Sequence, residues 1–180
     1  MLEQIKSSLS RLLGTEEDPR ESLRPLWHRT VELARLKHWY ANCHVEDSVS
    51  GRFDMICAVL SVVMVRLEAS ELRAESSLLA ELFVEDMDGQ LREFGVNDVV
   101  VGKRVGKLMS TLGGRLGAIR SVLNQHDEAK LADAMERNIT YTDDGSSQCV
   151  AEKLLGLHDA LAKVSGEALI AADFELVEAA

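Results

Sequence analysis

The sequence predicts an all-α protein, a single compact multi-helix domain organised around one long basic, glycine-rich helix and one buried apolar helix. Apolar residues recur at helical spacing along nearly the whole chain, and two-residue alternation is almost absent. Two prolines and 4% aromatic residues in 180 residues are few for a sandwich or barrel. One core is expected, because a domain of this length buries roughly 70% of its unfolded surface.

We divide the chain into an N-terminal helix with an acidic connector, residues 1–20, and a helical domain, residues 21–180. The opening segment mixes charged and apolar residues at helical spacing, ends at Gly14, and lacks the apolar run of a secretory signal. The next helix is expected over residues 23–40. Pro25 is compatible with this helix because it lies in the first turn.

A buried helix is expected next, over residues 52–69, after a loop at residues 41–51. Its longest apolar run, residues 55–65, is interrupted only by Ser61. That run is about half of the ~20 residues that a membrane-spanning helix needs. Its length favours a core helix, and a shallow membrane contact is the alternative.

The rest of the chain is expected to be helical, with short connections. Gly95 ends one helix, Asn97 or Asp98 caps the longest one, and Gly166 interrupts the chain before its last segment. The long helix would extend roughly 40 Å at 1.5 Å per residue. The expected helices cover residues 70–94, 98–125, 128–138 and 147–164.

Charge is unevenly distributed, with a net value of −10 for the whole chain. No acidic residue lies between Asp98 and Asp127, so this segment carries a net charge of +5. Subtracting that charge from −10 leaves a net charge of −15 on the rest of the chain. The acidic balance disfavours indiscriminate nucleic-acid binding, and no specific DNA binding is expected. The basic side chains of the segment are Lys103, Arg104, Lys107, Arg115 and Arg120.

The long helix has an apolar face and, beside it, a stripe of small residues. Steps of ~100° place Val101, Val105, Leu108, Leu112, Leu116, Ile119 and Leu123 on the apolar face. The small stripe consists of Gly102, Gly106, Ser110, Gly113 and Gly117. Each glycine opposes helix formation by ~1 kcal/mol, so close approach of another backbone is expected to compensate. That backbone belongs either to another helix of the domain or to a client helix, which would bind the small stripe and the basic residues Lys103, Arg104, Lys107 and Arg115.

Asp86 projects into an apolar arc of its predicted helix, whereas Asp88 points away. A buried carboxylate needs a partner, and Arg52 is expected to form a structural ion pair with Asp86, with Arg66 and Lys107 as other candidates. A catalytic carboxylate is the alternative. No second acid, nucleophile or oriented histidine accompanies Asp86 in sequence, so no catalytic residues are expected.

The cysteines Cys43, Cys57 and Cys149 are an odd and widely scattered set, which predicts reduced thiols rather than a disulfide framework. Potential metal ligands cluster most densely at His38, Cys43, His44, Glu46 and Asp47, where the spacing fits no zinc pattern. A hydrogen-bonded core histidine at position 38 is the favoured interpretation, and metal binding is the alternative. His28, His126 and His158 stand alone in the sequence. We therefore expect neither a metal nor a cofactor.

Two ordered strings resemble the ubiquinol-cytochrome c chaperone family. The first string, residues 34–56, contains an Ala-Arg pair, an aromatic pair, a Val-x-Asp loop and a Gly-Arg-Phe-Asp segment that opens a helix. The second string supplies an acidic helix, a Gly-Val turn and the basic helix. The residues that carry the resemblance are Arg35, Trp39, Tyr40, Asp47, Gly51, Arg52, Phe53, Asp54, Asp88, Arg92, Gly95 and Asp98.

The resemblance implies a non-enzymatic, helical assembly factor for ubiquinol-cytochrome c reductase that binds newly made cytochrome b or another membrane-protein client. It also implies a small partner protein and, for some members, a place near the ribosome. A cytoplasmic location with peripheral contact to an anionic inner membrane is expected, through Lys103, Arg104, Lys107 and Arg115. Solvation of these side chains is the alternative. The competing functions are a regulatory interaction module and an enzyme centred on Asp86 or His44.

Overall fold

The computed structural model of the chain describes residues 18–93 and 98–175. Within these ranges the chain is helical, and its only β-type pairing is an isolated antiparallel bridge between Val45 and Tyr141. The all-α prediction is therefore confirmed. The elements are η1 (Glu21–Leu23), α2 (Arg24–Ala34), α3 (Lys37–Ala41), α4 (Val49–Ala69), α5 (Arg73–Glu93), α6 (Asp98–Gln125), α7 (Glu128–Asn138), α8 (Ser147–Ala162) and α9 (Gly166–Ile170). The predicted N-terminal helix, within residues 1–17, lies outside the described residues.

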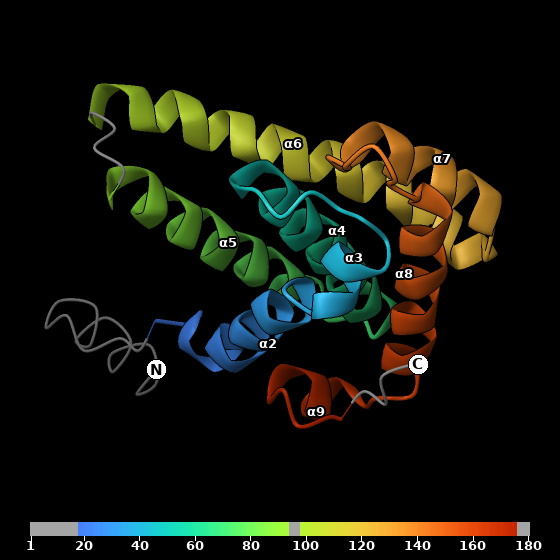
Figure 1. Cartoon of the computed structure of the whole chain (residues 1–180). Helices are drawn as coiled ribbons and strands as arrows, with labels where there is room; N and C mark the ends of the chain where they lie inside the picture. Colours follow the sequence, from blue (N-terminus) through green and yellow to red (C-terminus); the bar gives the residue numbers. More distant parts are fainter. Residues whose placement is uncertain (1–17, 94–97, 176–180) are drawn as a thin grey trace, which may run out of the picture.

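Helix α4 is the centre of the domain and the buried apolar helix that the sequence predicts. Its residues from Asp54 to Val65 are all buried, and it packs against α2, α5, α6 and α8. Figure 1 shows α6 on one side of α4, with α2 and α9 on the opposite side. The helix begins at Val49, because the Ser48 side chain accepts a hydrogen bond from the Gly51 amide and caps the first turn. None of the described helices has the length and apolar content needed to cross a bilayer.

The helix expected over residues 23–40 is wrong as a single element, because the chain breaks at Leu36. Leu36 has an extended backbone, with φ −58° and ψ 136°, and separates α2 from α3. Two aromatic side chains satisfy the carbonyl groups that the end of α2 leaves without helical partners. Trp39 Nε1 donates to the Leu33 carbonyl at 2.8 Å, and the Tyr40 hydroxyl donates to the Ala34 carbonyl at 2.9 Å. The aromatic pair thus folds α3 back against α2.

Helix α6 is the longest element, and its 28 residues extend about 42 Å. Its predicted apolar face is buried at Leu112, Leu116, Ile119 and Leu123. These side chains contribute to the contacts that α6 makes with α4, α5 and α7. The long-helix prediction, residues 98–125, is confirmed.

The C-terminal helices complete the domain. Helices α7 and α8 pack closely against each other, and α8 also packs against α4. Arg66 on α4 donates to the Leu161 and Val164 carbonyls, at 2.7 and 2.5 Å, and so caps the end of α8. This guanidinium group also donates to the Ser70 hydroxyl. Arg66 is therefore committed to structure and is not paired with Asp86.

Candidate functional site

A surface hollow of about 510 Å³ lies where α3, the following loop and the start of α4 meet. It is lined by Arg35, Lys37, Tyr40, Ala41, Asp47 and Arg52. All six lie within the first string, and four of them, Arg35, Tyr40, Asp47 and Arg52, are among the residues that carry the family resemblance. The sequence motif and the hollow therefore coincide. The residues of the motif come from two helices and the loop between them, which the fold brings together around the hollow.

An ion pair crosses one wall of this hollow. Arg52 Nε donates to Asp47 Oδ1 at 2.6 Å. This hydrogen bond holds the pKa of the Asp47 carboxyl below its usual value. Partial burial raises the pKa of Tyr40, so its hydroxyl stays protonated and donates to α2. With Arg35 and Lys37, the lining carries three basic groups and one acidic group.

The expected ion pair between Asp86 and Arg52 is wrong. Arg52 opens α4 and points to the preceding loop, where Asp47 is its partner, while Asp86 lies on α5 and is half-buried. The sequence alone does not show whether Arg52 pairs with Asp47 or with Asp86, because either carboxylate would neutralise its charge. Asp86 and His44 are not among the residues that line the hollow.

Gly51 lets the loop close onto the first turn of α4. A Cβ atom at this position would lie 2.0 Å from the Glu46 carbonyl oxygen and 3.0 Å from its carbonyl carbon. Those atoms belong to the backbone and cannot rotate away. Glycine is therefore the residue that fits between α4 and the loop that carries Asp47.

The Asp54 side chain connects α4 to α6 and to the loop between α7 and α8. Its carboxylate accepts hydrogen bonds from Arg115 Nη2 at 2.6 Å, from the Thr140 amide at 2.9 Å and from the Thr140 hydroxyl at 2.7 Å. The Asp54 and Arg115 side chains are 9% and 11% exposed. The Arg115 guanidinium carbon also lies 5.6 Å from the centre of the Phe53 ring. The last two residues of the Gly-Arg-Phe-Asp segment therefore fasten α4 to α6.

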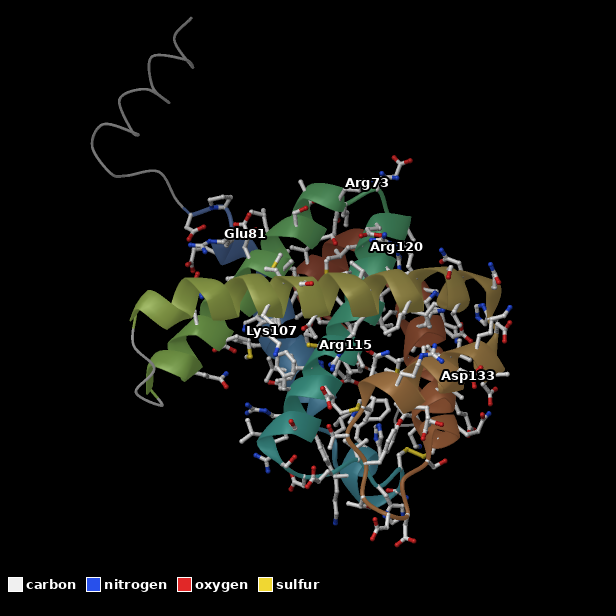
Figure 2. The ribbon with its side chains drawn as sticks, turned by 90° about the horizontal axis from the view of Figure 1, so that it is seen from above. Arg73, Glu81, Lys107, Arg115, Arg120 and Asp133 are labelled. Atoms are coloured by element: carbon white, nitrogen blue, oxygen red, sulfur yellow. A yellow bond between two sulfur atoms is a disulfide. The ribbon has the colours of Figure 1, made fainter. Side chains whose placement is uncertain are left out.

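Arg115 was expected to contact a client or a membrane, and that expectation is wrong. Its charge is neutralised internally by Asp54, and Figure 2 shows its side chain lying against the start of α4. Arg120, farther along the same helix, pairs at the surface with Glu68 at 2.7 Å. Lys107 is exposed. The side chains of Lys103 and Arg104 lie outside the described residues.

Helix α6 turns its small residues outward. Gly106, Ser110, Gly113 and Gly117 are exposed, and a Cβ atom built on any of the three glycines would meet nothing within 4 Å. We call these four residues the small-residue face. Met109, 42% exposed, lies beside it. No helix within residues 18–93 and 98–175 packs closely against these glycines, and the environment of Gly102 is not described.

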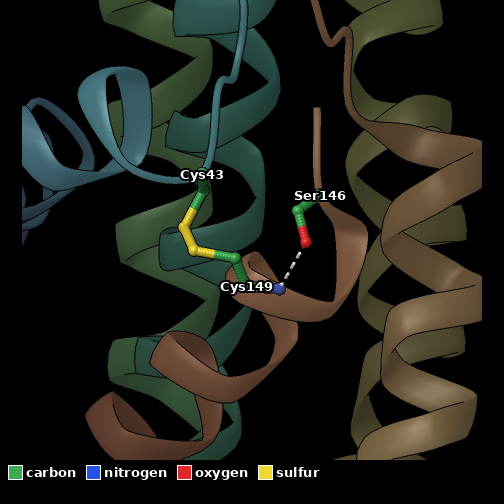
Figure 3. The surroundings of a disulfide bond; sticks show 3 residues. All are labelled: Cys43, Ser146 and Cys149. Atoms are coloured by element: carbon green, nitrogen blue, oxygen red, sulfur yellow. Dashed lines mark hydrogen bonds between the residues drawn. A yellow bond between two sulfur atoms is a disulfide. The ribbon is translucent and has the colours of Figure 1, made fainter. Parts of the chain in front are cut away.

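Cys43 and Cys149 form a disulfide between the loop after α3 and the first turn of α8, so the prediction of three reduced thiols is wrong (Figure 3). The Ser146 hydroxyl accepts a hydrogen bond from the Cys149 amide and caps α8. The Ser146 amide in turn donates to the Cys43 carbonyl at 3.1 Å. The two cysteines are 106 residues apart in sequence, and only the tertiary fold brings their Cα atoms to 5.3 Å. Cys57 remains a free, buried thiol.

The metal-site alternative around His38 loses one of its ligands, because Cys43 belongs to the disulfide. The half-buried His38 ring packs against Trp39 with ring centres 4.4 Å apart. A different set of donors, His126, His158 and Asp159, comes together at the other end of the domain. Sequence reasoning missed this set, since His126 and His158 are far apart in the chain, one in the turn after α6 and the other on α8.

The second string of the resemblance lies on α5 and α6 where it is described. Asp88 is half-buried on α5, Arg92 belongs to the same helix, and Asp98 is the first residue of α6. Gly95 lies outside the described residues, as do the side chains of Arg92 and Asp98. The string thus spans the α5–α6 connection.

The chain is an all-helical domain whose surface hollow is lined by residues of the first string. The ubiquinol-cytochrome c chaperone family model matches residues 41–177. The chain belongs to the ubiquinol-cytochrome c chaperone family. Its structure is similar to the crystal structure of the Cbp3 homologue from Brucella abortus, with a TM-score of 0.74 and 28% sequence identity. That similarity covers 99% of this chain and 97% of the other. No curated protein sequence gives a significant match.

These relationships support a chaperone or assembly-factor role for the cytochrome bc1 complex. The match begins at Ala41 and so includes the Val-x-Asp loop, the Gly-Arg-Phe-Asp segment and the whole of α6. Arg35, Trp39 and Tyr40 precede the matched range, yet Arg35 and Tyr40 line the hollow, and Trp39 and Tyr40 join α3 to α2.

Proposed function

We propose that this chain assists assembly of the cytochrome bc1 complex by holding an apolar helix of newly made cytochrome b against α6. The observation that carries the proposal is the small-residue face, which the described part of the chain leaves uncovered. The family supplies the kind of client, a protein of ubiquinol-cytochrome c reductase.

The glycines of α6 favour this use of the helix over a purely structural one. Each helical glycine costs roughly 0.5–1 kcal/mol relative to alanine. Close packing inside the domain would offset that cost, but among the described residues Gly106, Gly113 and Gly117 have no neighbour that a Cβ atom would touch. A face of small residues allows another helix backbone to approach closely, as it does between membrane helices. Close packing of a client helix against α6 would therefore offset the cost of these glycines.

The surroundings of the small-residue face suit an apolar helix. Met109 beside it is exposed, and methionine adapts its shape to irregular apolar partners. Leu112, Leu116, Ile119 and Leu123 of α6 are directed into the core, so the described part of the helix offers close contact without a large exposed patch. Such a surface can hold a client helix reversibly and release it into the membrane.

The protein is proposed to act on the cytoplasmic side of the inner membrane, in peripheral contact with anionic lipid. Lys107 is exposed, and Lys103 and Arg104 precede it on the same helix. Each basic residue near an anionic bilayer contributes about 1 kcal/mol. Arg115 is excluded from this contact because it is paired with Asp54. A small partner protein and the ribosome are further partners that the resemblance implies.

The client proposal is tested by purifying the full-length, affinity-tagged chain from membranes and measuring the cytochrome b that accompanies it. Gly113→Leu is expected to reduce the recovered cytochrome b, because a large side chain prevents close approach of the client helix. The matched control is Gly156→Leu on α8, a second exposed helical glycine with open space around its Cβ position. This control should recover cytochrome b as the unaltered chain does.

Equal recovery with both leucine variants would reject the small-residue face as the client site. A lower thermal stability of Gly113→Leu with no selective loss of cytochrome b would reject it as well. Recovery of water-soluble partners alone would favour the regulatory interaction module instead.

The membrane contact is tested separately with vesicles of mixed zwitterionic and anionic lipid. Pelleting of the full chain should fall between low and high salt, and Lys107→Glu should weaken it at low salt. Pelleting that is independent of salt would contradict this contact without affecting the client proposal.

A further inference from the structure

Three donor side chains meet where the α6–α7 turn lies against α8. The His126 Nε2 atom lies 2.6 Å from Asp159 Oδ1, and the His158 Nδ1 atom lies 3.2 Å from the same oxygen. The three donor atoms all lie within 4.8 Å of one another. We propose that His126, His158 and Asp159 form a binding site for a divalent transition-metal ion of the zinc class.

The donor set has the chemistry that such an ion requires. Neutral imidazole nitrogen suits zinc, cobalt, nickel and copper, and one carboxylate lowers the charge of the site. Bonds of about 2.0–2.2 Å in a tetrahedral arrangement place donors roughly 3.3 Å apart. The 3.2 Å separation is close to that value, whereas the 2.6 Å separation is a hydrogen-bond distance, so His126 and Asp159 would have to move apart by about 0.7 Å to admit the ion.

The backbone holds His126 in a conformation that disfavours most side chains. His126 has a φ of 50°, in the left-handed region, at the position after the end of α6 where glycine is common. Its amide donates to the Leu123 carbonyl, and the Asp127 amide donates to the Val122 carbonyl. These bonds complete the helix end and direct the imidazole toward α8. This turn holds the His126 imidazole in hydrogen-bond contact with Asp159 and close to His158, the proximity of donors that a ligand role requires.

The end of α6 adds an electrostatic contribution. The carbonyl groups at the C-terminus of a helix create negative potential, which favours a cation within the last turn. Helix α6 ends at Gln125, immediately before His126. The negative charge of the Asp159 carboxylate and the negative potential at the end of α6 therefore both favour binding of a cation.

The exposure of the three side chains fits a three-ligand site that remains open to solvent. His158 is 14% exposed, whereas His126 and Asp159 are 54% and 51% exposed. A fourth position is thus accessible to water or to a donor from a partner. The ion would join the α6–α7 turn to α8, at a place separate from the small-residue face and from the hollow.

The test uses the untagged, full-length chain after chelator treatment, titrated with Zn²⁺ by calorimetry. One equivalent is expected to bind. The variants are His126→Gly, which suits the left-handed backbone, and His158→Ala; the control is His28→Ala, an exposed histidine on α2. Because loss of an outer-shell partner already costs about 10–100-fold in affinity, loss of either ligand should weaken binding by at least about tenfold. His28→Ala should bind as the unaltered chain does.

Two further readouts keep the test independent of any variant that folds poorly. Co²⁺ bound to the unaltered chain should give the visible absorption of a tetrahedral nitrogen–oxygen site. Zn²⁺ should also protect two histidines from chemical modification, identified by peptide mapping as His126 and His158. Absence of saturable Zn²⁺ binding, or full binding by His126→Gly, would overturn the proposal.

Discussion

Arg115 and Asp54 join helices α6 and α4 through an ion pair that is almost entirely shielded from water. Arg115 Nη2 lies 2.6 Å from Asp54 Oδ1, and Thr140 satisfies the second carboxylate oxygen. This contact sets the position of α6 on the core and therefore determines which of its faces remains outside. The orientation of the proposed client surface thus depends on an aspartate of the Gly-Arg-Phe-Asp segment.

Arg115→Ala is expected to destabilise the domain by about 3–5 kcal/mol, because it leaves the buried Asp54 carboxylate without its charged partner. The measurement is urea unfolding of the full chain, followed by circular dichroism. Arg120→Ala is the matched control on the same helix, since Arg120 pairs with Glu68 at the surface. Its cost should not exceed about 1 kcal/mol. Equal costs for the two variants would contradict the assignment of a structural role to Arg115.

The sequence predicts the faces of α6 well but not the use of its charges. Leu112 and Ile119 are buried as their spacing indicates, and the small residues lie together. Arg115 and Lys107 look equivalent in sequence, however, because helical spacing does not reveal that Asp54 lies opposite one of them. Pairing between distant residues depends on tertiary structure, so it is absent from any local pattern.

Gly51→Ala is expected to lower the unfolding free energy by about 1–3 kcal/mol or more, because the new Cβ atom would lie 2.0 Å from the Glu46 carbonyl oxygen. Relief of that contact requires the loop to move away from α4, which also displaces Asp47 from Arg52. The neighbouring exposed residue provides the control, and Ser50→Ala should change stability by no more than about 0.5 kcal/mol. An alanine variant as stable as the unaltered chain would show that the loop relaxes freely.

Thiol labelling should give a different count in each of three conditions. The folded chain without reductant should not react, because burial raises the pKa of the Cys57 thiol to about 12 and the other two cysteines are paired. Denaturation should expose one thiol, and denaturation with reductant should expose three. Two or more reactive thiols in the folded, unreduced chain would contradict the disulfide.

Reduction of the Cys43–Cys149 bond should destabilise the chain by about 2–4 kcal/mol, as expected for a disulfide that closes a long loop. The measurement compares urea unfolding with and without reductant. A double variant, Cys43→Ser with Cys149→Ser, is the control, and reductant should leave its stability unchanged. Sensitivity of that variant to reductant would place the effect elsewhere.

The two largest departures from the sequence prediction share one physical cause. The break between α2 and α3 at Leu36 follows from hydrogen bonds made by Trp39 and Tyr40, and the disulfide follows from packing of α8 against the loop after α3. In both cases the deciding partner is a specific atom brought near by folding. Periodicity predicts which residues are helical, but it carries no information about such partners.

Gly113→Ala is expected to raise the unfolding free energy by roughly 0.5–1 kcal/mol, because alanine favours the helix and the new Cβ atom meets nothing within 4 Å. Gly156→Ala on α8 should give a similar gain, since its surroundings are equally open. The measurement is the urea midpoint of each variant at unchanged slope. A stabilised Gly113→Ala variant with unimpaired folding would show that the glycine is not needed for the fold. Destabilisation of Gly113→Ala would instead reveal a close internal neighbour and would remove the physical basis for a client helix on this face of α6.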